Sequence, residues 1–273
     1  MNKNNKEQMN NILNGEDTPK KVEEEKLGGF EELETSDELG ESIAEKLSSG
    51  PPVYSVPIIN FINMEGLSQE RVKPLVQKEI TFSPFAGHYF NSTRATLKNS
   101  FKTNNLDLVA RKISELKANE EGTSYAKNLR GFDVKAMEKY VELYPKISLE
   151  FRGLDKSKQV KVVDRIYNYL GIDISVSPTF VFRTEYKGKK IVGAVKLYTK
   201  STKSLSAIKM KMMSYLTFLI LNDKYKKEGE EVLPQFCITI DLFNKNVVEC
   251  PKDLIATKKA LREVHSKIIK ALT

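Results

Sequence analysis

A chain of 273 residues has room for one large domain, or for one domain with an appendage. Its 40% of hydrophobic and 29% of charged residues are typical of a globular protein with a packed core. The formal charge is +8, but residues 1–50 carry six lysines and thirteen acidic residues, so residues 51–273 have a net charge of +15. Such an imbalance favours a polyanionic partner, either a nucleic acid or an anionic membrane surface. A basic surface without a specific partner is the alternative.

No segment of the sequence predicts secretion or membrane insertion. The N-terminal residues, MNKNNKEQMNN, lack the apolar region of a signal peptide. The longest apolar run covers residues 212–221 and is far shorter than the roughly 20 residues of a membrane span. The two cysteines, Cys237 and Cys250, lack a metal-binding spacing, and a hairpin turn at residues 244–246 would place Cys250 opposite Ile240. We therefore expect a cytoplasmic protein with reduced thiols and no membrane partner.

The N-terminal part of the chain is predicted to contain a tail and a helical region. Residues 1–52 are polar, acidic in their middle and poor in aromatic side chains, which predicts a disordered acidic tail. Residues 53–155 are expected to form a mainly helical region packed on the core. Its expected helices are one interrupted by Pro74, one starting near residue 91, and two over residues 106–118 and 132–144.

Residues 156–273 predict an α/β core with a C-terminal helix. An amphipathic helix over residues 156–171 comes first, followed by a β-hairpin over 174–200 and a nearly all-apolar helix over 205–227. A second hairpin has the sequence QFCITIDLF–NKN–VVEC, and Pro251 opens the terminal helix. The predicted fold class is therefore α/β of the α+β kind, with a small mixed sheet flanked by helices.

The hairpin over residues 174–200 alternates with period two, which predicts one buried and one solvent-exposed face. A two-residue turn with Gly188 first would pair Phe180 with Leu197 on the buried face. Pro178 indicates a bulge or an edge position. The register assigns these residues to the exposed face: Ser177, Thr179, Arg183 and Glu185 on one strand, and Ala194, Lys196, Tyr198 and Lys200 on the other.

Basic residues gather in this hairpin and at the start of the following helix. Lys211 and Tyr215 are four residues apart on that helix, so we expect both to point towards the exposed face. Such a surface predicts phosphate contacts with DNA or RNA that depend on salt and not on base sequence. The candidate nucleic-acid-binding residues are Arg183, Lys187, Lys189, Lys190, Lys196, Lys200, Lys203 and Lys211.

The order of elements resembles the RecB-like branch of the PD-(D/E)XK nuclease superfamily. The resemblance covers about residues 156–243: a helix, a hairpin whose second strand ends in Gly193-Ala194-Val195-Lys196, a helix carrying Tyr215, and a strand. It implies a restriction-endonuclease-like core. In that family an aspartate on the first strand, and an acid two residues before a lysine, hold Mg²⁺, which activates water against a phosphodiester. The lysine stabilises the transition state.

Carried over to this sequence, the resemblance assigns the lysine to Lys196 and the tyrosine of the following helix to Tyr215. Ala194 occupies the place of the metal-binding acid, and Lys211 that of the family's glutamine. The first aspartate falls near Ser177 or Thr179. Both metal-binding carboxylates are therefore missing, and without them the oxygen ligands that Mg²⁺ prefers are absent. The predicted site contains no metal and needs no cofactor.

Three functions stay open at this point. The first is a nucleic-acid-binding protein with a nuclease-like fold and an inactive metal site. The second is an active Mg²⁺-dependent nuclease in which Glu185, expected as a diagonal neighbour of Ala194, replaces the missing acid; Lys196, Glu185 and Tyr215 are then the catalytic candidates. The third is a protein-interaction module with the same fold and a protein partner.

Overall fold

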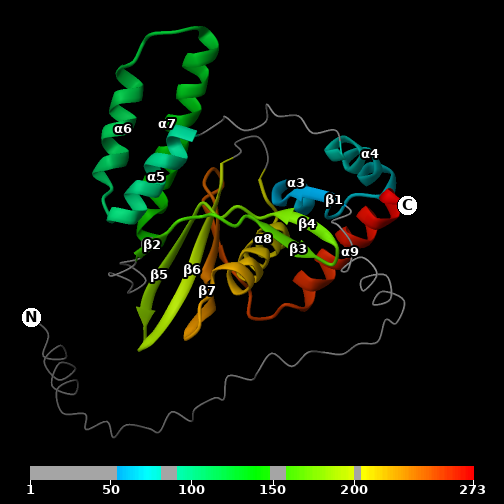
Figure 1. Cartoon of the computed structure of the whole chain (residues 1–273). Helices are drawn as coiled ribbons and strands as arrows, with labels where there is room; N and C mark the ends of the chain where they lie inside the picture. Colours follow the sequence, from blue (N-terminus) through cyan, green and yellow to red (C-terminus); the bar gives the residue numbers. More distant parts are fainter. Residues whose placement is uncertain (1–53, 81–90, 148–157, 200–203) are drawn as a thin grey trace, which may run out of the picture. The chain divides into compact units, whose positions relative to one another are not determined.

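The computed structural model describes residues 54–80, 91–147, 158–199 and 204–273. The predicted acidic tail therefore lies outside the described residues. In this part of the chain there are seven α-helices, one π-helical turn and two mixed β-sheets (Figure 1). The α+β class predicted from the sequence is confirmed. None of the helices in the described part is long and apolar enough to cross a bilayer.

The larger sheet has five strands in the order β2-β5-β6-β7-β8. Strands β2, β5 and β6 are successively antiparallel, β6 and β7 are parallel, and β8 returns antiparallel to β7. The parallel step requires a crossover, which α8 provides between β6 and β7. The strands are β2 (Lys158–Val160), β5 (Phe180–Tyr186), β6 (Lys189–Tyr198), β7 (Glu230–Asp241) and β8 (Asn246–Glu249).

The smaller sheet joins the N-terminal half of the chain to the core. Its order is β1-β4-β3, with β1 parallel and β3 antiparallel to β4. Its strands are β1 (Tyr54–Pro57), β3 (Ile166–Tyr169) and β4 (Ile172–Ser175). The region predicted as mainly helical thus also contributes a strand to the structure.

Along the sequence, one group of helices precedes the first strand of the larger sheet, and a second group follows its later strands. The first group consists of α3 (Ile58–Asn63), α4 (Gln69–Ile80), α5 (Asn91–Thr103), α6 (Asp107–Ala118) and α7 (Ser124–Ile147). The second consists of α8 (Ala207–Ile220), which continues as the π-helical turn η1 (Leu221–Tyr225), and α9 (Ile255–Leu272).

Both faces of the five-stranded sheet are covered. On one face Phe180, Phe182 and Val195 pack in one core with residues of α5, α6 and α7. On the other, Val181 and Ala194 pack with residues of α8, α9 and the smaller sheet. A strand buried on both faces loses its solvent-exposed side. The exposed hairpin face predicted from the alternation is therefore wrong: Ala194 has 0% and Tyr198 has 2% of its surface exposed.

The amphipathic helix predicted over residues 156–171 is wrong. In the described part of that range the chain forms β2 and β3, which belong to different sheets. Val160 and Tyr169 are partly buried against the core on the α8 side. Of the apolar residues whose spacing suggested a helix, Val163 and Ile166 are 62% and 49% exposed, whereas β3 packs Tyr167 and Tyr169 against the core.

The register of the β5–β6 hairpin differs from the predicted one by two residues. Phe180 pairs with Val195, not Leu197, because the turn consists of Lys187 and Gly188. Both turn residues have positive φ, +50° and +75°, as a type I′ turn requires. A shift of two residues preserves the face of every side chain, so the apolar partners were assigned to the correct side.

The first predicted hairpin strand is divided between the two sheets. Residues up to Ser175 belong to β4, and Phe180 starts β5. Between them Ser177 has a φ of +40°, and Pro178 follows. The irregularity that Pro178 indicated is therefore the point where the chain crosses from the smaller to the larger sheet. This crossing brings Ser177 near the end of β6.

Pro74, predicted to interrupt a helix, and Pro145, next to the predicted end of the helix over residues 132–144, both lie inside helices. Pro74 is within α4 and Pro145 is within the last turn of α7. The predicted helices over 106–118 and from residue 91 are confirmed, whereas α9 begins at Ile255, four residues after Pro251. Buried α8 also agrees with the prediction.

The cysteine pairing expected from the second hairpin is wrong. The backbone N–H of Cys250 donates to the carbonyl of Cys237 at 2.9 Å, so the two residues are cross-strand neighbours. Both thiols are buried and free. Burial raises the pKa of the Cys250 thiol to about 12, which makes the thiolate a negligible species at neutral pH.

Candidate anion-binding site

Lys196 lies near the carboxyl end of β6, at the passage between the two sheets. Its ammonium group donates a hydrogen bond of 2.6 Å from Nζ to the carbonyl oxygen of Ser177. On the adjacent strand it is paired with Thr239, whose hydroxyl accepts a hydrogen bond from Ser214 of α8 at 2.9 Å. The lysine is therefore held on the face that α8 covers, where β4, β6 and β7 approach one another.

The electrostatic surroundings of Lys196 are positive. Burial, reinforced by the charges of Arg94 on α5 and Arg165 before β3, lowers the pKa of Lys196 to about 7. Both arginines are exposed to solvent. We call Lys196, Arg94 and Arg165 the Lys196 cluster. In the described part of the chain, no ion pair with a carboxylate joins any of the three. Cations that act on one another without an ion-paired carboxylate among the described residues are suited to hold an anion. Arg165 also lines a hollow with Asp164, Asp173 and Asp223.

Among the described residues, no carboxylate forms an ion pair with Lys196 to replace the acid that Ala194 lacks. Ala194 pairs with Val181, and Glu185 pairs with Lys190 at the opposite end of β6. At about 3.3 Å per residue, Lys190 and Lys196 are roughly 20 Å apart along the strand. The expectation that Glu185 is a diagonal neighbour of Ala194 is wrong. Within the described ranges, no three histidine, cysteine or acidic side chains could hold a metal ion together.

Tyr215 and Lys211, expected on one face of the helix after the hairpin, differ in their exposure to solvent. Tyr215 is buried and stacks on Phe218 with ring centroids 6.3 Å apart. Burial, with Tyr167 as the next contributor, raises the pKa of its phenol. Lys211 is exposed to solvent. The buried environment assigns Tyr215 a packing role.

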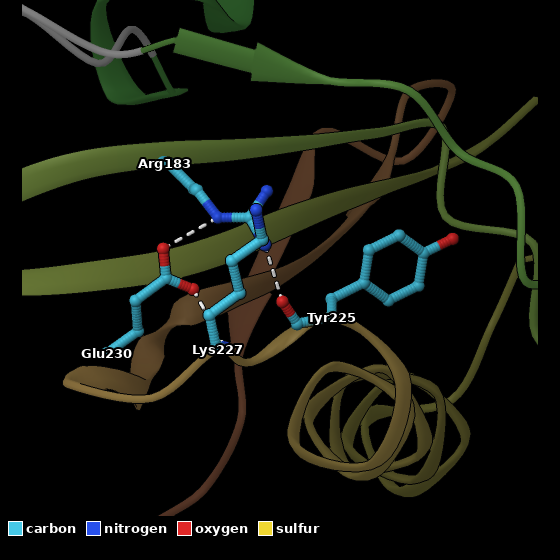
Figure 2. A network of polar contacts seen from close by, with 4 residues as sticks. All are labelled: Arg183, Tyr225, Lys227 and Glu230. Carbon is cyan, nitrogen blue, oxygen red and sulfur yellow. Dashed lines mark hydrogen bonds and ion pairs between the residues drawn. The ribbon is translucent and has the colours of Figure 1, made fainter.

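Arg183 belongs to a structural network and not to an exposed basic face (Figure 2). Its Nε donates to the Glu230 carboxylate at 2.7 Å, and its Nη2 donates to the carbonyl oxygen of Tyr225 at 2.5 Å. The second carboxylate oxygen of Glu230 accepts from the backbone N–H of Lys227 at 3.0 Å. This network fixes the end of η1 to β5 and β7, so Arg183 is engaged within the protein.

The remaining predicted phosphate ligands lie at the other end of the hairpin or outside the described residues. Lys187, Lys189 and Lys190 are exposed at the β5–β6 turn. Lys189 forms an ion pair with Glu231 at 2.9 Å, and Lys187 is 5.5 Å from the centre of the Tyr186 ring. Lys200 and Lys203 lie outside the described residues. The β5–β6 turn and the Lys196 cluster are therefore two separate basic surfaces at opposite ends of the hairpin.

Reasoning from the sequence missed Arg94 and Arg165. Arg94 is in the first turn of α5, and Arg165 lies in a stretch that the sequence predicted as helix. Neither position has a local pattern that distinguishes it from other basic residues. Only the approach of α5 and the β2–β3 connection to the end of β6 brings them to Lys196.

Comparison with models of known protein families and with curated proteins gives no match.

Proposed function

We propose that this protein binds nucleic acid by its phosphates at the Lys196 cluster, in a nuclease-like fold that does not cleave its ligand. The observation that carries the proposal is the convergence of Lys196, Arg94 and Arg165 without a paired carboxylate among the described residues. A phosphate placed among these side chains would favour the charged form of Lys196 and offset its burial. The net charge of +15 over residues 51–273 supplies long-range attraction for the same ligand.

The order of elements supports the nuclease-like fold. The order is α7, the three short strands β2 to β4, the β5–β6 hairpin, α8 and β7, and β7 lies parallel to β6. The helix that precedes the hairpin is α7, not the helix predicted over residues 156–171. Lys196 keeps the place on the second hairpin strand from which the resemblance to the PD-(D/E)XK superfamily was inferred.

The side chains around Lys196 favour binding over cleavage. A metal-dependent phosphodiesterase uses carboxylate oxygens to position its ion. Here Ala194 occupies one such place, and the charged groups that act on Lys196 are arginines. Arginines hold phosphate oxygens without activating water, so the geometry suits a ligand that is retained and released intact.

Fluorescence anisotropy of labelled DNA and RNA, titrated with the full chain at increasing salt, tests the proposal. We expect affinity to fall linearly with salt on logarithmic axes, as it does when phosphate contacts release counterions. Arg94→Ala and Arg165→Ala should each weaken binding at least about threefold and make the salt slope shallower. Lys196→Met keeps the apolar length of the side chain and removes its charge, so this variant should also bind more weakly.

Matched variants locate the interface. Lys259→Ala removes an exposed lysine of α9 and should leave the affinity unchanged. Lys190→Ala does the same at the hairpin turn. Salt-independent binding, or an affinity that falls only with Lys190→Ala, would contradict the proposal. Recovery of a stable protein partner after nuclease treatment, with no binding of DNA or RNA, would support the interaction module instead.

A further inference from the structure

The two cysteines of the chain lie directly opposite each other on adjacent antiparallel strands. The last pair in the register of β7 and β8 joins Ile238 to Glu249. The next position along both strands places Cys237 opposite Cys250, and the backbone N–H of Cys250 donates to the carbonyl oxygen of Cys237 at 2.9 Å. Residues that face each other in this way project their side chains to the same face of the sheet.

The distance between such cross-strand neighbours matches the geometry of a disulfide. The Cα atoms of a hydrogen-bonded antiparallel pair are about 5.5 Å apart, and disulfides join Cα atoms that are about 4.4–6.8 Å apart. Both cysteines belong to the core that contains residues of α8 and α9, so their side chains extend in the same direction. A bond between the two sulfur atoms therefore needs rotation of the side chains and no separation of the strands.

Weak contacts hold the two thiols in the reduced state. The thiol of Cys237 donates to the carbonyl oxygen of Leu233, and that of Cys250 donates to the carbonyl oxygen of Pro251, both at 3.8 Å. A thiol is a poor donor, so these contacts offer little resistance to rotation of either side chain. Burial raises the pKa of the Cys237 thiol, and the neighbouring Cys250 raises it further. The two sulfur atoms therefore already interact.

Access to the buried pair depends on β8. This strand has four residues and is the last strand of the five-stranded sheet, so it is held by one neighbouring strand and not by two. Short elements at the edge of a sheet open locally at a lower free energy than the core does. Opening of β8 uncovers both thiols together, and their thiolates form more readily in water than in the core.

We propose that Cys237 and Cys250 are a redox-active pair, which a small-molecule disulfide oxidises to a cross-strand bond that locks β8 to β7. With β8 open, the thiolate of Cys250 attacks one sulfur of oxidised glutathione and releases one reduced glutathione. The thiolate of Cys237 then attacks the Cys250 sulfur of the mixed disulfide and releases the second glutathione. Two electrons pass from the cysteines to the glutathione disulfide, and the two thiol protons end on the two glutathione molecules.

The lock acts on the part of the sheet that supports Lys196. Thr239 of β7 pairs with Lys196 on one side and with Val248 of β8 on the other. The hydroxyl oxygen of Ser214 on α8 lies 2.9 Å from that of Thr239 and 3.1 Å from the carbonyl oxygen of Val248. Opening of β8 therefore breaks contacts one strand away from Lys196, and the bond between the cysteines prevents this opening.

Intact mass measurement of the full chain, after incubation with oxidised and reduced glutathione in defined ratios and alkylation of the remaining thiols, tests the inference. The chain has two cysteines, so a monomer that takes up no alkylating agent and retains no glutathione contains this bond. We expect this product, and a pair of tryptic peptides joined through Cys237 and Cys250 that dithiothreitol separates. Urea below the onset of global unfolding should accelerate the oxidation, because it favours the opening of β8.

The oxidised protein should be more stable than the reduced one. The bond restricts the unfolded chain, so the midpoint of thermal unfolding should rise by about 5 °C or more. Amide hydrogen exchange in β8 should slow at least about tenfold, whereas exchange in β1 of the smaller sheet should not change. Cys237→Ala and Cys250→Ala each keep one thiol and are the matched variants. After the same treatment, neither variant should show the higher midpoint or the slower exchange.

Three results would overturn the inference. Thiols that stay free both with and without urea would show that the pair is not oxidised by a disulfide. Glutathione adducts or intermolecular dimers as the sole products would show that the two sulfur atoms do not meet. A cross-strand bond that leaves the unfolding midpoint unchanged or lowers it would show that the native sheet does not accommodate the disulfide.

Discussion

The ammonium group of Lys196 donates a hydrogen bond of 2.6 Å to the backbone carbonyl oxygen of Ser177. Ser177 has a φ of +40° and lies where the chain passes from the three-stranded to the five-stranded sheet. The bond therefore joins the end of β6 to a turn whose backbone is in the left-handed region. It also fixes a cation in partly buried surroundings, which has measurable consequences for stability and for binding.

Replacing Lys196 by Met should change the stability of the protein in a pH-dependent way. Burial lowers the pKa of Lys196 to about 7 in the folded chain, whereas an unfolded lysine has a pKa of about 10.4. Below both values the folded state bears the full cost of the buried charge, and this cost disappears as pH rises through that window. The stability of Lys196→Met relative to the parent should be greatest near pH 6 and fall towards about pH 10.

Urea unfolding at several pH values checks this trend. Each pKa unit of difference between the two states corresponds to about 1.4 kcal/mol, so a change of more than 1 kcal/mol across the window is readily measured. The hydrogen bond to Ser177 favours the charged form of Lys196 and so helps to set its folded-state pKa; its loss in the variant belongs to the same pH-dependent difference. A stability difference that is constant with pH would contradict the assigned pKa.

Binding of nucleic acid should weaken as pH rises above 7. Near pH 6 Lys196 is charged and all three members of its cluster attract phosphate; above its pKa of about 7 the free protein loses that charge. Because the bound phosphate favours the protonated lysine, binding takes up a proton. We expect the affinity to fall roughly tenfold between about pH 6 and pH 8.5 at constant ionic strength.

Lys196→Met is the control for this pH dependence. The variant has no ammonium group to titrate at this position, so its weaker affinity should be nearly independent of pH. The described residues also include His265, whose pKa burial lowers below its usual value. A pH dependence that persists in Lys196→Met and vanishes in His265→Gln would assign the effect to the histidine.

Arg183→Met should destabilise the protein without a direct effect on nucleic acid. The substitution removes the donor for the Glu230 carboxylate, whose side chain is only 10% exposed, and leaves the carbonyl of Tyr225 without that partner. Losing hydrogen bonds between charged groups costs about 1.5–3 kcal/mol. Lys189→Ala breaks the exposed pair with Glu231, which is 56% and 45% exposed, and should cost less than about 1 kcal/mol. Equal losses in the two variants would exclude a structural role for the Arg183 network.

The alternation of the β5–β6 hairpin predicted which side chains share a face, but not what covers each face. Phe180, Phe182 and Val195 were correctly grouped as apolar partners because a period of two is a local property of a strand. The opposite face was predicted to be exposed since it carries Arg183 and Lys196. Those two cations are instead accommodated by long-range partners, Glu230 and Ser177, that no local pattern reveals.

The candidate site was only partly predictable for the same reason. Lys196 could be singled out from its position on the second hairpin strand. Arg94 and Arg165 come from elements 102 and 31 residues earlier in the chain, and their approach depends on how α5 and the smaller sheet pack. The prediction of Glu185 near Ala194 failed because the turn consists of Lys187 and Gly188, which shifts the register of the whole hairpin by two residues.

Gly193→Ala should lower the stability of the five-stranded sheet. A Cβ atom at this position would lie 2.5 Å from Cζ of the Phe182 ring and 2.8 Å from the carbonyl oxygen of Phe236. Phe182 is only 2% exposed and cannot turn away into solvent. Overpacking of this kind costs about 1–3 kcal/mol, measured as a lower urea midpoint with an unchanged slope.

A second glycine and a double variant show whether the Phe182 contact is the cause. Gly131→Ala places a methyl group in open space on α7 and should stabilise the helix by about 0.5–1 kcal/mol. Phe182→Leu alone should destabilise the core, because it removes part of a buried ring. Combined with Gly193→Ala, it should cost less than the sum of the two single changes, since the smaller side chain makes room for the methyl group. Strict additivity would mean that the Phe236 carbonyl, and not the Phe182 ring, sets the requirement for glycine at position 193.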